Sequence, residues 1–438
     1  MKKKLIIILG SILIVLIGGI ITFFSLYKKA PEYQYSPNEL FQEGLAAVEL
    51  DGKYGFINKN GETVIDFVYD DADSFYYGIT IVKSGSKYKM IDKSGKQITT
   101  EGYEFLRIDE KSGLVVFRKN GKYGLLSREG ELLADAVYDS ISNFSEGLAI
   151  VKSGTKYGYI DESGKLTIEK NYNSVRDFNE GLAVINLDGK YGFINKKGEL
   201  IIGNNYDYAE SFYQGYAIVV VNTTSGNNYK VIDKNGKVVF TDYDSIQRTK
   251  NCFIVNKDGE YSILDKEGSS TTLTKYNEVE IINSGFALDD LYFEMFTASD
   301  DKNYYVINES GNVVISMAKE EGQEINVYID VFNLDVYLGK YVDNNLTLLN
   351  NKGQMLNFVC ENFLGAIFNG KLVVQKSQKY GVIDFIGNTI IDFNYDGIGL
   401  TADGYAIVEV KEKYGIIGLQ GNIIAPIQYD FIVINYGM

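Results

Sequence analysis

The sequence contains no histidine and no tryptophan, and it has only two cysteines and three prolines in 438 residues. Without histidine the chain cannot build a Ser-His-Asp or Cys-His catalytic device or an imidazole metal site. The two cysteines, Cys252 and Cys360, are too few for a zinc cage, and we expect buried thiols rather than a disulfide. The sequence therefore predicts no metal site, no cofactor and no enzyme of these classes.

Acidic residues outnumber basic ones beyond the N-terminal end of the chain. The formal net charge is −15, and residues 1–30 carry five lysines and no acidic residue, so the rest of the chain carries −20. A surface this acidic repels nucleic acid and anionic lipid. We therefore expect no nucleic-acid partner.

The N-terminal end has the pattern of a membrane anchor. Residues 5–27 form a run of 23 residues without charge, long enough to cross a bilayer core of about 30 Å as a helix. The lysines of residues 1–4 outnumber those at 28 and 29, which favours a cytoplasmic N-terminus. We predict a signal-anchor helix over 5–27 and a stalk over 28–39, with the remainder extracellular; a cleaved secretory signal is the alternative.

Beyond the stalk the chain repeats one unit of about 34 residues, seen most clearly as GKYGFINKNG from Gly52 to Gly61. The aromatic residue after the lysine is the anchor position. It recurs with nearly the same neighbours in eleven copies, one of them decayed to leucine, at Tyr54, Tyr88, Tyr123, Tyr157, Tyr191, Tyr229, Tyr261, Tyr304, Leu346, Tyr380 and Tyr414. A fixed period of this size is typical of repeat architectures.

Each unit contains a tight turn. Seven residues after every anchor stands a glycine, and three residues before that glycine the chain carries Asn or Asp in nine copies. An Asx side chain followed three residues later by glycine specifies a hairpin. The flanking segments alternate apolar and polar residues, and a third strand follows in phrases such as FSEGLAIV (Phe144 to Val151). We predict a three-stranded meander, with a short fourth edge at the Tyr-Asp step fifteen residues after the anchor.

The fold class is therefore all-β, an array of about eleven units over residues 40–438 that is irregular at about 252–369. Eleven units exceed the usual 4–8 blades of a propeller, and three strands fall short of the four in a standard blade. We accordingly expect an open β-superhelix, with one or two closed β-propellers as the alternative. The array begins and ends within a unit, as would a ring that splits one blade between its two ends and also an open array that starts at an arbitrary phase of the repeat.

Phrases such as DGKYGFINKNGE and NYNSVRDFNEGLAVINLDGKYGFINKKGE resemble the bacterial WG (KWG) repeat family over about residues 40–438. Every tryptophan of that pattern is a tyrosine here, and the glycine after the anchor is kept in six copies. The resemblance implies a β-rich repeat protein with a binding or scaffolding role.

Two kinds of residue are candidates for function. Aspartates recur one residue after the second tyrosine of the unit, and we interpret them as structural turn residues because catalytic carboxylates need not recur. The recurrent tyrosines are expected in the core, whereas the off-pattern Tyr76, Tyr77, Tyr213 and Tyr216 are the candidates for ligand contact.

We therefore expect a membrane-anchored extracellular protein, not an enzyme, that binds or scaffolds a protein or glycan partner at the bacterial cell envelope. The alternative is a carboxylate-dependent enzyme acting on envelope polysaccharide.

Overall fold

The computed structural model describes residues 39–224, 226–249, 251–273, 276–281, 295–319, 325–329, 336–342, 345–350 and 352–434. All of them belong to the compact unit Pro37–Met438. Within these ranges every regular element is a β-strand, and none contains a helix that could cross a bilayer. The predicted basic end 1–4, anchor helix 5–27 and nearly all of the stalk 28–39 lie outside the described residues.

The strands form eleven antiparallel sheets, which we call blades 1–11. Blade 1 contains β1 (Leu45–Leu50), β2 (Lys53–Asn58), β3 (Thr63–Tyr69) and β43 (Phe431–Ile432); blade 2 contains β4 (Asp71–Ala72), β5 (Ile79–Ser84) and β6 (Lys87–Asp92); blade 3 contains β7 (Phe105–Ile108), β8 (Val115–Lys119), β9 (Lys122–Leu126) and β10 (Leu132–Tyr138). Blade 4 contains β11 (Ser140–Ser145), β12 (Leu148–Ser153), β13 (Lys156–Asp161) and β14 (Leu166–Tyr172); blade 5 contains β15 (Ser174–Val175), β16 (Leu182–Leu187), β17 (Lys190–Asn195) and β18 (Leu200–Tyr206); blade 6 contains β19 (Tyr208–Ala209), β20 (Tyr216–Thr223), β21 (Gly226–Asp233) and β22 (Val238–Tyr243).

The irregular stretch of the sequence keeps the same plan. Blade 7 contains β23 (Ser245–Arg248), β24 (Phe253–Lys257), β25 (Glu260–Leu264) and β26 (Ser270–Thr272); blade 8 contains β27 (Glu278–Ile281), β28 (Met295–Ser299), β29 (Asn303–Asn308) and β30 (Val313–Ala318); blade 9 contains β31 (Ile325–Ile329), β32 (Val336–Val342), β33 (Asn345–Asn350) and β34 (Met355–Val359). Blade 10 contains β35 (Asn362–Phe368), β36 (Lys371–Lys376), β37 (Lys379–Asp384) and β38 (Thr389–Tyr395); blade 11 contains β39 (Gly397–Leu400), β40 (Tyr405–Val410), β41 (Lys413–Gly418) and β42 (Ile423–Tyr429).

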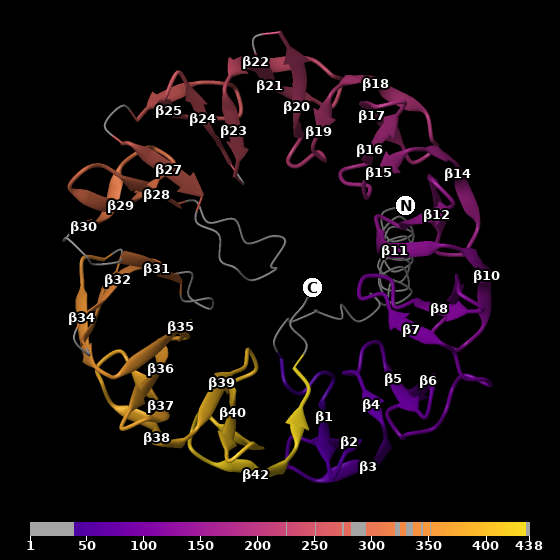
Figure 1. Cartoon of the computed structure of the whole chain (residues 1–438), viewed down its shortest axis with the longest axis vertical. Helices are drawn as coiled ribbons and strands as arrows, with labels where there is room; N and C mark the ends of the chain where they lie inside the picture. The colour runs from indigo at the N-terminus through magenta and orange to yellow at the C-terminus, as the bar shows by residue number, and fades with distance from the viewer. Residues whose placement is uncertain are drawn as a thin grey trace, which may run out of the picture. The chain divides into compact units, whose positions relative to one another are not determined.

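A blade has four strands because the Tyr-Asp step contributes one of its own. The chain leaves an outer strand at the second tyrosine and enters the short inner strand of the next blade, as from Tyr69 into β4. Figure 1 shows these inner strands on the inside of the ring. The strands that contain the anchor and the second tyrosine lie toward the outside of the ring. The short fourth edge predicted at the Tyr-Asp step is therefore confirmed, and it belongs to the next blade. In blade 2 the outer position is held by isolated bridges at Tyr103 and Gln97 rather than by a strand.

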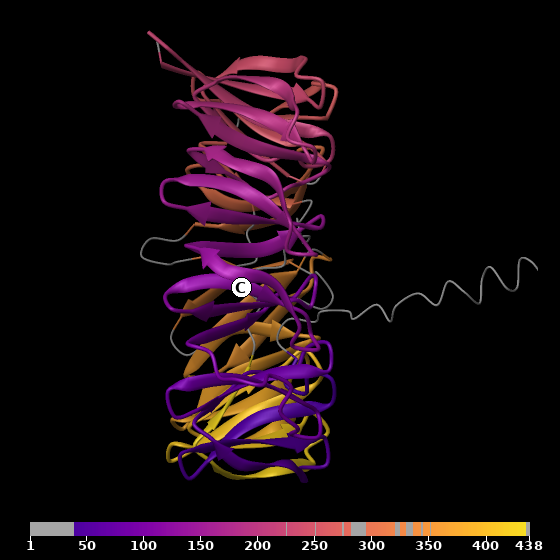
Figure 2. The same ribbon diagram turned by 90° about the vertical axis from the view of Figure 1, so that its right-hand side faces the viewer.

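The ring is closed, so the expectation of an open superhelix was wrong and the propeller alternative is correct. Strand β43, near the C-terminus, pairs with β1 through Val48↔Ile432 and Glu49↔Phe431, and it completes blade 1. Asp403 of blade 11 accepts the backbone N–H groups of Leu40 and Phe41 at 3.0 and 3.1 Å. The sheets are seen from the side of the ring in Figure 2.

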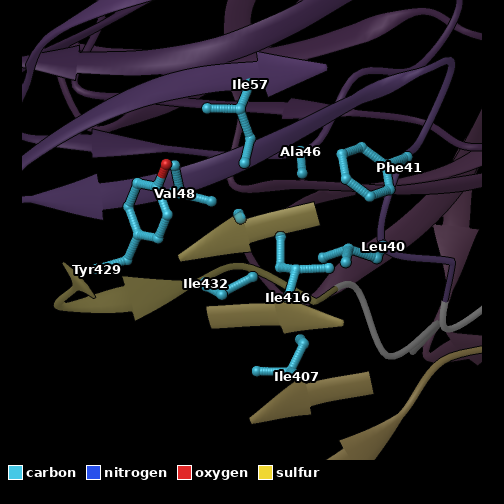
Figure 3. Close-up of a cluster of buried hydrophobic side chains, with 10 residues drawn as sticks. Leu40, Phe41, Ala46, Val48, Ile57, Ile407, Ile416, Tyr429 and Ile432 are labelled. Carbon is cyan, nitrogen blue, oxygen red and sulfur yellow. The ribbon is translucent and has the colours of Figure 1, made fainter. Parts of the chain in front are cut away.

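The hydrophobic core is divided into eleven clusters, one between each pair of neighbouring blades. At the junction of blades 1 and 11, Val48 and Ile432 of blade 1 share a buried cluster with Ile416 of blade 11 (Figure 3). A single blade has no core of its own, so each blade is stable only against two neighbours. Closure follows physically, because an open array would expose the apolar faces of its two end blades to water.

Aromatic pairs lie at the centre of several of these junctions. The phenylalanine of the third-strand phrase is fully buried, and it meets an aromatic ring two residues beyond the anchor of the preceding blade. Phe56 and Phe75 have ring centroids 4.9 Å apart, and Phe193 and Phe212 are 4.8 Å apart, both edge to face. Such pairs add about 0.5–1.5 kcal/mol beyond their area burial.

The predicted hairpin turn is confirmed. Asn58 accepts the backbone N–H groups of Asn60 and Glu62 on its Oδ1 atom, at 2.9 and 3.1 Å. Gly61 has φ +78°, the left-handed conformation that glycine adopts without steric cost. A built Cβ atom at Gly61 would lie 2.1 Å from the Ile424 carbonyl oxygen, so this turn also packs tightly on blade 11.

The glycine directly after the anchor is required for a different reason. Tyr54 pairs with Tyr69 and Phe56 pairs with Ile65, so the outer strand carries two extra residues across this short span and bulges over Gly55. A Cβ atom at Gly55 would lie 2.7 Å from the Ile65 carbonyl oxygen.

Blade 6 lacks this glycine and has a smaller bulge. Lys230 follows the anchor there, the ladder runs from Tyr229↔Tyr243 to Val231↔Phe240, and the outer strand carries one extra residue instead of two. This smaller bulge explains why Tyr243 comes one residue early in the sequence.

The tyrosines of the repeat form cross-strand pairs, as at Tyr157↔Tyr172 and Tyr414↔Tyr429. The second tyrosine is buried in several blades, for example at Tyr138 and Tyr429, whereas the anchors are half-buried and pack on the margin of the core. Both cysteines are buried free thiols, as predicted.

Candidate functional site

The inner strands are the edge strands of their sheets on the side that faces the interior of the ring (Figure 1). Blades 3–7 place a group of polar and aromatic side chains on these strands. We call this group the inner wall: Arg107, Asn143, Arg176, Tyr208, Glu210 and Arg248, with the carbonyl of Ile141.

Arg107 lies on β7 and reaches into the next blade. Its guanidinium donates to the Asn143 side-chain oxygen and, at 3.2 Å, to the Ile141 carbonyl oxygen. The side chain is half-buried, and burial lowers the pKa of Arg107 from its ordinary value, although arginine remains charged at any physiological pH. Arg107 is thus a cation whose orientation is set by the neighbouring blade.

Arg176 follows β15 directly and repeats this geometry two blades further on. Its guanidinium lies over the Tyr208 ring at 5.3 Å from the centroid and donates to the Tyr208 hydroxyl at 3.1 Å. Tyr208 is 39% exposed and packs against Tyr191 at a centroid distance of 6.1 Å. Stacking on an aromatic face fixes the plane of the guanidinium and leaves its edge toward solvent.

A third arginine, Arg248, closes the inner wall at blade 7. It reaches back to blade 6, where it donates to the carbonyl oxygens of Ser211 and Tyr216 at 3.1 and 3.0 Å and lies 3.6 Å from the Glu210 carboxylate. Burial raises the pKa of the Glu210 carboxyl, and the guanidinium groups of Arg248 and Arg176 oppose that rise. The polar contacts of the Arg248 guanidinium are therefore made with neighbouring groups of blade 6.

The four tyrosines predicted to contact ligand are not brought together. Tyr76 and Tyr77 enter β5 of blade 2, whereas Tyr213 and Tyr216 enter β20 of blade 6. Tyr77 adopts φ +54° and donates its hydroxyl to the carbonyl oxygens of Glu110 and Lys111, at 2.7 and 3.1 Å, which ties blade 2 to blade 3.

The remaining three tyrosines pack on their neighbours. Tyr76 packs on the core between blades 2 and 3, Tyr213 lies under the Arg248 guanidinium, and Tyr216 packs edge to face on Phe253. In three other blades the position of Tyr77 is glutamate, which makes a comparable tie. Glu146 accepts the N–H of Gly181 at 3.0 Å and pairs with Lys196 at 3.1 Å.

The recurrent aspartates also connect blades, rather than closing a local turn as expected. Asp139 pairs with Lys122 of blade 3 and accepts the N–H of Gly154 of blade 4 at 2.6 Å. These hydrogen bonds lower the pKa of the Asp139 carboxyl, the lysine contributing most. Equivalent pairs are Lys53–Asp70, Lys190–Asp207, Lys379–Asp396 and Lys413–Asp430.

The described part of the chain contains no group of three or more Cys, Asp or Glu residues arranged to hold a metal ion. The inner wall offers guanidinium N–H donors, an exposed aromatic ring and edge backbone. This combination can recognise a planar anionic group by hydrogen bonding. It supplies binding chemistry.

Sequence reasoning missed Arg107 and Arg176, although a signal was present. The chain has five arginines, and two of them stand four residues after the second tyrosine of their units, Tyr103 and Tyr172. A shared repeat phase in so rare a residue indicates a shared place in the fold. Their contacts with the next blade needed the structure.

Comparison with solved structures gave matches of low similarity. A crystal structure of the eukaryotic initiation factor is 9% identical, with 89% of this chain and 98% of that chain covered and a TM-score of 0.43. Hsv2 of Kluyveromyces marxianus is 9% identical, with 58% and 97% covered and a TM-score of 0.30. PorZ of Porphyromonas gingivalis, a bacterial surface component of the type IX secretion system, is 9% identical, with 91% and 67% covered and a TM-score of 0.21. At these scores the likeness supports no inference about function.

A search among curated proteins found no match. The model of the WG-containing repeat matches seven segments, at residues 30–54, 54–88, 123–157, 157–191, 191–223, 380–414 and 414–438, which together make up half of the chain. The segments contain seven of the ten tyrosine anchors, those of blades 1–5, 10 and 11, and the match holds although each of these positions has tyrosine in place of tryptophan. The chain therefore belongs to the family of WG-containing repeat proteins.

Proposed function

We propose that the chain is a membrane-anchored scaffold of the bacterial cell envelope whose β-propeller binds a protein partner. The observation that supports binding is the inner wall, where the Arg107 and Arg176 cations and the exposed Tyr208 are held in place by neighbouring blades. Preoriented donors of this kind lower the entropic cost of binding.

The envelope location is supported by the sequence. The uncharged run 5–27 is long enough to span a bilayer, and the lysines before it favour a cytoplasmic N-terminus, which leaves the propeller outside. Protease added to intact cells should then digest the propeller. If the propeller is protected until the cells are lysed, the proposed location is wrong.

The binding function is tested with the full-length chain in mild detergent, used as bait in extracts of the host cell envelope. The extract is divided, and one half is treated with protease that is then inactivated. We expect a specific partner that is lost after protease treatment. Capture that survives protease would indicate a wall glycan instead, and no capture under either condition would contradict the scaffold function.

A further inference from the structure

Arg107 and Arg176 differ from Arg118 and Arg248 in having no carboxylate within ion-pair distance among the described residues. Arg118 lies 3.7 Å from the Glu104 carboxylate and Arg248 lies 3.6 Å from that of Glu210. Within the described part of the chain, Arg107 and Arg176 hydrogen-bond only to neutral oxygens and form no ion pair. Asp109 and Glu110 act on Arg107, and Glu210 acts on Arg176, only beyond ion-pair distance, so no carboxylate of the described residues takes up the N–H donors of either guanidinium.

Both guanidinium groups retain donors for such a ligand. A guanidinium carries five N–H groups. Arg107 donates to two acceptors and Arg176 to one, among the described residues. The acceptors hold each guanidinium plane in place, and a carboxylate can bind the remaining edge through two parallel hydrogen bonds.

An extended peptide fits the surroundings better than a sugar does. Strands β7 and β15 are terminal strands of their sheets, so their backbone edges toward the ring interior pair with no strand of their own sheets. A peptide can add to such an edge through its main chain. The Tyr208 ring, by contrast, is already covered on one face by the Arg176 guanidinium, which reduces the area available for stacking on a sugar.

We propose that Arg107 and Arg176 form a carboxylate-binding site on the inner wall that takes an acidic peptide segment. This assignment deepens the proposed function, because it rests on the protein binding a protein partner, and it names the chemistry of the segment that enters the ring. An alternative role for both arginines is purely to brace one blade against the next. Bracing predicts a loss of stability and no ligand binding when the arginines are replaced.

The test uses the full-length chain in mild detergent and a fluorescently labelled oligoglutamate peptide, read by fluorescence polarisation. Oligoglutamine is the uncharged control, and oligogalacturonate provides a carboxylate on a sugar. The variants are Arg107→Gln and Arg176→Gln, each alone and both combined in a double variant. Glutamine is chosen because it keeps a donor for the neighbouring blade. Arg118→Gln is the matched control, because it removes the same charge from an arginine of blade 3 that already has a carboxylate partner.

We expect oligoglutamate to bind, salt to weaken the binding, and each inner-wall substitution to weaken it by about tenfold. Arg118→Gln should have no effect, and thermal unfolding should confirm that the double variant is folded. The assignment is overturned if oligoglutamine binds equally well, if Arg118→Gln has the same effect, or if oligogalacturonate is preferred. It is also overturned if oligoglutamate does not bind.

The two proposals fail separately. If the envelope extract yields a protein partner that the double variant still captures, the scaffold function stands and the inner-wall site is wrong. If oligoglutamate binds through the two arginines but the extract yields no partner, the site stands and the scaffold function is wrong.

Discussion

Replacing the glycine that follows an anchor should damage one blade through a backbone clash. At Gly158 a built Cβ atom lies 2.4 Å from the Ile168 carbonyl oxygen and 2.9 Å from both the Glu169 carbonyl carbon and the Lys170 nitrogen. All three atoms belong to the bulged backbone of β14, which cannot rotate away as a side chain can. Gly158→Ala therefore requires the bulge to move, and we expect a cost of about 3 kcal/mol, the upper end for overpacking a well-packed site.

Gly399→Ala is the matched control for this prediction. Gly399 also lies in a strand and outside the left-handed region, but no atom lies within 4 Å of its built Cβ. Alanine there should be neutral or stabilise by up to about 1 kcal/mol, because it restricts the unfolded chain.

Thermal unfolding followed by far-UV circular dichroism compares the two variants, since the chain has no tryptophan for fluorescence. Hydrogen exchange should locate the loss of protection in blade 4 and its neighbours. Equal melting temperatures for Gly158→Ala and Gly399→Ala would refute this explanation of the glycine.

Three further predictions concern the contacts between blades. Ile432→Ala should destabilise the ring by about 2–4 kcal/mol because Ile432 is 5% exposed in the core of the closing junction, whereas Phe431→Ala, at a side chain 49% exposed, should change the melting temperature little. Glu146→Ala should lower the free energy of unfolding, measured by chemical denaturation, by about 1 kcal/mol, because it removes the acceptor of the Gly181 N–H and the partner of Lys196. The same substitution at the exposed Glu129 is the control and should be neutral. The pKa of Asp139 is lowered in the folded state from its ordinary 3.8, so its contribution to folding stability is complete above pH 3.8 and is lost as the pH falls through the folded pKa. Asp139→Asn should therefore make the melting temperature less dependent on pH in that range. An unchanged pH dependence would contradict the inter-blade role of Asp139.

Local features of the fold were predictable because their causes lie within a few residues. The turn from Asn58 to Gly61 follows from one Asx side chain and one left-handed glycine. The same patterns did not decide between an open and a closed array. An inner strand such as Asp71–Ala72 has two residues, too short to show an alternating period, so the predicted fourth edge was not counted as a full strand of a propeller blade.

The candidate site was less predictable than the fold. Tyr76 and Tyr213 were chosen because they depart from the repeat, but they pack within their own blade junctions. Arg176 and Tyr208 are in contact only because consecutive inner strands lie side by side, 32 residues apart in sequence. Such contacts depend on how blades are arranged around the ring, which the hydrophobic pattern of a single unit does not contain. The membrane anchor at 5–27 remains a prediction.

The junction between blades 1 and 11 also bears on how the protein is made. Leu40 contacts Asp403 across 363 residues of sequence, and β1 receives β43 only after nearly the whole chain exists. The other ten blades consist of strands that precede β43 in the sequence, whereas blade 1 keeps an unpaired edge until β43 is available. Contacts so distant in sequence form slowly. Completion of blade 1 therefore depends on the strand that comes latest in the sequence among those of the ring, and a chain interrupted before residue 430 would leave the apolar faces of blades 1 and 11 uncovered.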